Sequence, residues 1–201
     1  MIAFRPSQTL WKRARTILEW CSRCLLLLGV LALGYSGAVW ASAHIYQAYL
    51  SWRLEHSQGF SPVRPGSAIG RIRIPRLRLS AVVLEGDDSG TLRLAVGHIP
   101  GTALPGRNGN VAIAGHRDTF FRGLRHIQKN DVITFEMPTG SYRYRVEAIQ
   151  IVGPDDTQVL NPSEQSTLTL VTCYPFSFIG PAPNRFIVRA HQISRQPRSS
   201  G

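Results

Sequence analysis

Lysine is scarce in this 201-residue chain, although basic residues are not. Lysine occurs only at Lys12 and Lys129, within a total of 23 Lys and Arg residues against 12 Asp and Glu and a net charge of +11. No long run of basic residues appears. Nucleic-acid-binding domains usually concentrate basic side chains in one patch or stripe. The pattern therefore argues against nucleic acid as a partner and leaves anionic lipid or an acidic envelope polymer open.

Charged side chains are absent from residues 24–52. The apolar core of this stretch, 24–43, is about as long as a bilayer-spanning helix needs to be. Five basic residues and one acid precede it, and a basic flank favours the cytoplasmic side of a membrane: Arg5, Lys12, Arg13, Arg15 and Arg23, with Glu19. We expect a single-pass protein of the cytoplasmic membrane whose N-terminus is inside and whose main domain is outside.

A cleaved signal peptide is the alternative, because Ala41-Ser42-Ala43 has the small-residue pattern of a cleavage site. The length of the apolar stretch and the aromatic residues around its outer half favour an uncleaved anchor. The predicted organisation is a cytoplasmic N-terminus (1–23), a transmembrane signal anchor (24–46), a stalk (47–66), one outer domain (67–194) and a tail (195–201).

Only three cysteines are present, and they are divided by the predicted membrane segment. Cys21 and Cys24 lie at its inner edge, whereas Cys173 lies in the outer domain. Topology therefore leaves Cys173 without a disulfide partner in its own chain. An unpaired thiol outside the cytoplasm is buried and inert, bonded to another chain, or reactive.

The outer domain consists of short β-type runs separated by turn residues. Several runs alternate apolar and polar residues, as Tyr142-Arg-Tyr-Arg-Val146 does, which is typical of strands with one buried face. Seven or eight such strands without helical spacers predict a mainly antiparallel β-barrel or sandwich. The expected strands are 68–74, 77–84, 110–114, 131–137, 141–152, 168–172 and 185–193, with short helices at 91–95 and 120–127.

Three residues with reactive side chains stand at the ends of predicted strands. Cys173 ends the run 167–172, His116 follows the run 110–114 after one glycine, and Arg185 opens the last run. A thiol becomes nucleophilic at neutral pH with help from an imidazole or a fixed positive charge. If the last two strands pair, Arg185 lies beside Cys173, where it could stabilise a thiolate, a substrate carbonyl or an oxyanion. Taken singly, His116 also fits a turn histidine and Arg185 a surface arginine.

The motifs around these residues resemble the sortases, a family of transpeptidases with an eight-stranded β-barrel. The resemblance covers residues 69–193 and rests on Leu170-Val-Thr-Cys173, on Asn110-Val-Ala-Ile-Ala-Gly-His-Arg-Asp118, and on Arg185 twelve positions beyond the cysteine. The runs 97–106 and 173–185 most resemble class D members.

The resemblance implies a mechanism. Cys173 would attack the Thr–Gly bond of an LPxTG-like sorting signal on a secreted protein and form a thioacyl enzyme. His116 would protonate the leaving amine and deprotonate the incoming one, which would come from peptidoglycan or a pilin lysine. Arg185, assisted by Thr172, would bind substrate or the oxyanion. His98 would line the groove, unless it is a turn histidine.

Some alternatives stay open at this point. The chain could be a catalytically inactive, membrane-tethered β-domain that binds envelope components, a cysteine peptidase, or an L,D-transpeptidase. The last family places its histidine and cysteine close together, whereas 57 positions separate His116 from Cys173. We expect no cofactor and no metal, since the histidines lack ligand spacing. Asp155 and Asp156 are weak candidates for a calcium site.

Overall fold

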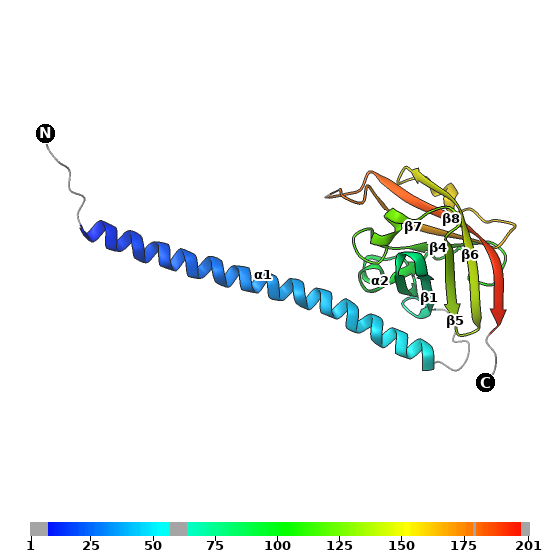
Figure 1. Cartoon of the computed structure of the whole chain (residues 1–201), viewed down its shortest axis with the longest axis horizontal. Coiled ribbons are helices and arrows are strands. Elements are labelled where there is room, and N and C mark those ends of the chain that lie inside the picture. Colours follow the sequence, from blue (N-terminus) through cyan, green and yellow to red (C-terminus); the bar gives the residue numbers. More distant parts are fainter. Residues whose placement is uncertain (1–7, 57–63, 179, 198–201) are drawn as a thin grey trace. The chain divides into compact units, whose positions relative to one another are not determined.

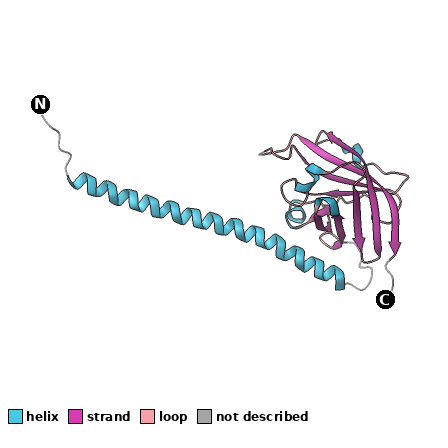
Figure 2. Ribbon diagram, in the orientation of Figure 1, coloured by secondary structure: helices cyan, strands magenta, loops and turns pink. Residues whose placement is uncertain are grey.

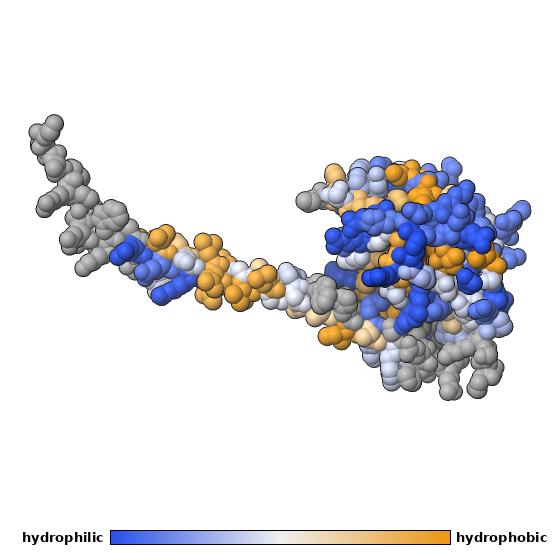
Figure 3. Space-filling model, in the orientation of Figure 1, coloured by the Kyte–Doolittle hydropathy of each residue, from blue (hydrophilic) through white to orange (hydrophobic). Residues whose placement is uncertain are grey.

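The computed structural model describes residues 8–56, 64–178 and 180–197, which fall into two compact units that divide between His44 and Ile45. The first unit consists of most of the long helix α1 (Gln8–His56). Within it, the 22 residues Ile17–Ala38 are long and apolar enough to cross a membrane, and none of that window is buried in the protein. In Figure 3 the middle of α1 is mostly orange, while hydrophilic side chains lie near its start. By length and composition it fits a membrane anchor, although a signal sequence would meet the same test.

The second unit is a closed eight-stranded β-barrel, which confirms the predicted fold class (Figures 1 and 2). Its strands follow one another around the barrel in the order β1-β2-β3-β4-β7-β8-β6-β5. They are β1 (Ala68–Ile74), β2 (Leu79–Glu85), β3 (Val96–His98), β4 (Asn110–Ala114), β5 (Val132–Met137), β6 (Gly140–Val152), β7 (Thr167–Tyr174) and β8 (Asn184–Pro197). The short helices between them are η1 (Pro75–Leu77), α2 (Ser89–Leu94), η2 (Arg122–His126) and η3 (Thr157–Leu160).

Two strand pairs are parallel, β2 with β3 and β4 with β7, while the other pairs around the barrel are antiparallel. The strand β3 was not predicted, because its three residues are too few to show an alternating pattern. The strand expected at 77–84 begins instead at Leu79, because Pro75–Leu77 form a 3-10 turn and Arg78 adopts a left-handed φ of 51°.

Alternation along the strands fills the barrel with apolar side chains. On β6, Tyr142, Tyr144 and Val146 are buried, while Arg143 and Arg145 between them are exposed. Full burial of a large apolar side chain contributes about 1.5–3 kcal/mol. This core holds the ends of β4, β7 and β8 in one rigid frame.

The last turns of α1 belong to the barrel unit rather than to the span. Leu50 is 2% exposed and packs on Val82, Leu84 and Ala95. The Gln47 side-chain amide donates to the Leu94 carbonyl at 2.6 Å and accepts from the Val82 backbone N–H at 3.0 Å. The segment expected to be a stalk, 47–66, therefore begins as helix packed on β2; residues 57–63 lie outside the described part of the chain.

Candidate functional site

The parallel pairing of β4 with β7 places His116 and Cys173 at one edge of the barrel. Ala114 is the register partner of Val171, and the Gly115 N–H donates to the Val171 carbonyl at 3.1 Å. His116 lies two residues beyond Ala114, and Cys173 lies two residues beyond Val171. The 57 positions between His116 and Cys173 equal the offset of this ladder. Parallel strands end at the same edge of a sheet, so both residues lie at this edge of the barrel.

The antiparallel pairing of β7 with β8 adds Arg185. Cys173 and Arg185 are register partners, and Arg185 also lies opposite Val152 on β6. The Cβ atoms of directly opposed residues lie about 4.5–5.5 Å apart and point to the same face. Cys173, His116 and Arg185 are all partly buried and line one groove with a volume of about 390 Å³.

The remainder of this groove is mainly apolar and is walled by the connection between β6 and β7. The Asn110 side-chain amide donates to the carbonyls of Val159 and Asn161 at 2.9 and 3.2 Å, and Thr169 donates to the Asn110 side-chain oxygen at 2.7 Å. Sequence reasoning missed Asn110, although a polar residue opening an otherwise apolar strand was a usable signal. The apolar lining comprises Leu92, Ile99, Ala114, Val152, Val159, Leu160, Val171 and Ile187.

Thr172 also lines the groove, but its hydroxyl proton is used in a hydrogen bond within the barrel. The side chain is 2% exposed, and its hydroxyl donates to the Gly115 carbonyl at 2.6 Å. The bond joins the strand that carries Cys173 to the residue that precedes His116. Since a hydroxyl has one proton, this geometry favours a positioning role over donation to an oxyanion.

Arg185 is held by its own loop. Its Nη1 atom donates to the carbonyls of Ala182 and Asn184 at 3.2 and 3.1 Å. A guanidinium has five N–H donors, so it retains donors for a ligand.

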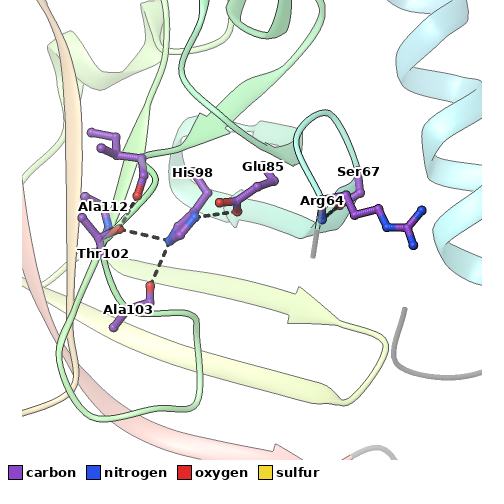
Figure 4. A network of polar contacts seen from close by, with 8 residues as sticks. Arg64, Ser67, Glu85, His98, Thr102, Ala103 and Ala112 are labelled. Atoms are coloured by element: carbon purple, nitrogen blue, oxygen red, sulfur yellow. Dashed lines mark hydrogen bonds and ion pairs between the residues drawn. The ribbon is translucent and has the colours of Figure 1, made fainter. Parts of the chain in front are cut away.

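His98 is not brought together with the other predicted residues. It is 2% exposed and is not among the residues that line the groove. Its Nδ1 atom lies 2.7 Å from a Glu85 carboxylate oxygen, and its Nε2 atom lies 3.0 Å from both the Ala103 carbonyl and the Thr102 hydroxyl (Figure 4). Thr102 in turn donates to the Ile99 carbonyl and accepts from the Ala112 N–H. His98 is the last residue of β3, and this network ties the β3–β4 connection to the end of β2.

The two aspartates considered for calcium are exposed on the β6–β7 connection. The Asp156 carboxylate accepts from the Gln158 N–H at 3.2 Å and so caps η3. Across residues 8–56, 64–178 and 180–197, no three His, Cys, Asp or Glu side chains converge as metal ligands.

Comparison with known proteins agrees with the fold. A family model described as a sortase domain matches residues 72–193. Sortase D of Bacillus subtilis is 33% identical over 141 residues, which cover 70% of this chain and 71% of that protein. The chain belongs to the sortase family, whose members are transpeptidases.

Solved structures extend this relationship. A sortase D5 transpeptidase of Clostridium perfringens superposes with a TM-score of 0.67 at 29% identity and covers 74% of this chain and 99% of its own. Sortase E1 of Streptomyces coelicolor, solved with a tripeptide in its active site, superposes with a TM-score of 0.61 at 28% identity, covering 70% of this chain and 96% of its own. Class D sortases are thus among the relatives, as the sequence motifs predicted.

Proposed function

We propose that this protein is a cysteine transpeptidase that cleaves LPxTG-like sorting signals through a thioacyl intermediate and transfers the acyl group to an amine. One observation carries the proposal: two strand registers bring Cys173, His116 and Arg185 to the same groove. The tripeptide in the active site of the Streptomyces coelicolor relative supports a peptide ligand.

In the first half-reaction, the Cys173 thiolate attacks the carbonyl carbon of the scissile Thr–Gly bond. Arg185 donates to the oxyanion that forms, or holds the carbonyl that precedes it. His116, carrying the proton from the thiol, gives it to the leaving amine as the C–N bond breaks. A thioester between Cys173 and the threonine carbonyl remains.

In the second half-reaction, an amine attacks this thioester. His116 accepts the proton of the amine, the C–S bond breaks, and the new amide leaves with the thiolate restored. The acceptor is an amine of peptidoglycan or a pilin lysine, and the donors are secreted proteins with C-terminal sorting signals.

The location follows from the apolar helix and its flank. We place the protein in the cytoplasmic membrane, crossing once within α1, with residues 1–23 inside and the barrel outside. The exposed, apolar window Ile17–Ala38, which carries charge only at Glu19 and Arg23 near its start, supports an anchor, and the basic residues around that start support this orientation.

Trapping of the acyl enzyme tests the proposal. Wild-type protein incubated with an LPxTG peptide should gain the mass of the acyl fragment on Cys173, and Cys173→Ala should lose both trapping and cleavage. The matched control, Cys21→Ala with Cys24→Ala, should retain them. Added amine should convert the product from free acid to amide; release of free acid alone would identify a peptidase. Trapping that survives Cys173→Ala would refute the mechanism.

A further inference from the structure

The connection between β7 and β8 joins the strand that ends beside Cys173 to the strand that begins at Arg185. Two arginines bind its backbone. Nη2 of Arg117 donates to the carbonyls of Phe178 and Gly180 at 2.6 and 3.0 Å. Nη1 of Arg185 donates to the carbonyls of Ala182 and Asn184 at 3.2 and 3.1 Å. Four carbonyls at alternate positions of this connection are thus bound by guanidinium groups, two by Arg117 and two by Arg185.

Arg117 comes from the segment that carries His116. Its guanidinium carbon also lies 5.9 Å from the centre of the Phe178 ring, within the range of a cation–π contact. Phe178 is 45% exposed, so the Arg117 contact is a specific constraint on a ring that is otherwise largely open to solvent. The structure describes no partner for the buried Nη1 atom of Arg117.

We infer that Arg117 is a positioning residue that anchors the β7–β8 connection to the histidine segment, so that Arg185 can exchange its loop carbonyls for a substrate oxygen. The inference rests on the proposed function. Nη1 of Arg185 is occupied by carbonyls one and three residues before it in the chain. When the guanidinium turns toward a substrate, these carbonyls lose their donor. The bonds from Arg117 lie nearer the Cys173 end of the same connection and persist through that exchange.

The residue type suits this task. Nη2 of Arg117 binds both carbonyls while the planar guanidinium lies over the Phe178 ring, whereas a lysine ammonium is a point charge on a flexible stem and has no plane to stack. Lysine at this position should therefore keep the charge and lose most of the anchoring. Small displacements of a positioned group cost up to about a hundredfold in rate, which sets the scale of the expected effect.

The test uses the full chain in detergent with Arg117→Met, Arg117→Lys and Arg117→Ala. Arg122→Met is the matched control, because Arg122 is an exposed arginine five residues further along the same segment. The rate of amide hydrogen exchange in residues 176–184 of the full chain measures how firmly the loop is anchored, and this measurement needs no substrate. Thioacylation kinetics report its consequence, and melting temperatures verify that each variant is folded.

We expect exchange in residues 176–184 to be about tenfold or more faster in Arg117→Met and Arg117→Lys than in wild type and Arg122→Met. We expect kcat/KM for thioacylation to fall by about tenfold to a hundredfold in the same two variants. Millimolar guanidinium should restore part of the rate to Arg117→Ala and none to Arg122→Met. A role in stability alone would not produce that rescue.

Unchanged exchange in the Arg117 variants would overturn the inference, whether or not any peptide is cleaved. Faster exchange together with wild-type thioacylation would show that Arg117 anchors the loop but does not affect the site. That result would overturn the inference as well. If wild type forms no thioacyl enzyme, the proposed function fails on its own, and the exchange data still decide whether Arg117 anchors the loop. If Arg117→Met does not fold, Arg117→Lys supplies both measurements.

Discussion

Cys173 and Arg185 oppose each other as register partners near the end of the β7–β8 ladder, and β6 continues the row with Val152. The arginine is therefore held over the groove by two neighbouring strands. The sheet sets the position of Arg185, and the bonds from Nη1 to the loop carbonyls hold its guanidinium in place.

Replacing Arg185 tests this relationship. Arg185→Ala should lower kcat/KM for thioacylation by about 10²–10³, the usual loss when an oxyanion donor is removed. Arg185→Lys should retain only part of the wild-type kcat/KM, because a lysine ammonium lacks the planar fork of donors of a guanidinium. Alkylation of Cys173 by a small reagent should continue in both variants, since the thiol stays in place. Equal turnover in wild type and Arg185→Ala would remove Arg185 from the mechanism.

Thr172→Val should destabilise the protein, because it leaves the Gly115 carbonyl without its 2.6 Å donor inside the barrel. An unpaired buried acceptor costs about 1–3 kcal/mol. Thr172→Ser, which keeps the hydroxyl, is the control. Thermal unfolding measures the difference, and thioacylation should slow in the valine variant as the histidine segment loosens. A valine variant with wild-type stability but impaired chemistry would instead favour a direct oxyanion role.

His98→Phe should lower the free energy of unfolding with little change in the KM for peptide. The substitution leaves the Glu85 carboxylate and the Ala103 carbonyl without the imidazole in a site where His98 is 2% exposed. A cost of about 1–3 kcal/mol per unpaired group follows. Denaturant unfolding together with peptide kinetics separates the two effects. A raised KM at unchanged stability would instead support a substrate-binding role for His98.

Leu50→Ala should destabilise the barrel in the full chain, because this residue of α1 is 2% exposed against Val82, Leu84 and Ala95. Removal of a buried leucine costs about 2–5 kcal/mol. Ile45→Ala is a matched apolar control on the same helix, where the side chain is 69% exposed. The measurement is thermal unfolding of both variants in detergent. Equal melting temperatures would show that the end of α1 does not stabilise the barrel.

Asp131 should make stability depend on pH in the acid range. Hydrogen bonds from Arg76, one at 2.6 Å, lower the pKa of the Asp131 carboxyl. A lowered pKa in the folded state stabilises the protein above the unfolded pKa of about 3.9, and this contribution is lost as pH falls through the folded value.

Asp131→Asn should therefore melt a few degrees below wild type at neutral pH, and the gap should close below about pH 4. Glu136→Gln removes the exposed ion pair with Arg73 and should have little effect. A gap that stays constant down to pH 2 would show that the Asp131 charge contributes nothing.

Local pattern was sufficient for much of the fold. The strands Ala68–Ile74 and Asn110–Ala114 match their predicted bounds, because alternation and flanking turn residues mark both ends. Figure 2 shows how strands dominate the barrel unit, as this patterning indicated. The motifs around Cys173, His116 and Arg185 likewise indicate the family without reference to the fold.

The assembly of these elements was settled by tertiary structure alone. Nothing in the sequence shows that β4 pairs in parallel with β7 at an offset of 57 residues, although this register brings His116 and Cys173 to the same edge of the barrel. The sequence also could not show that His98 bonds Glu85, or that Arg117 and Arg185 share the carbonyls of one loop. Alternation is a local property of a strand, whereas register and loop contacts depend on how distant side chains pack when the barrel closes.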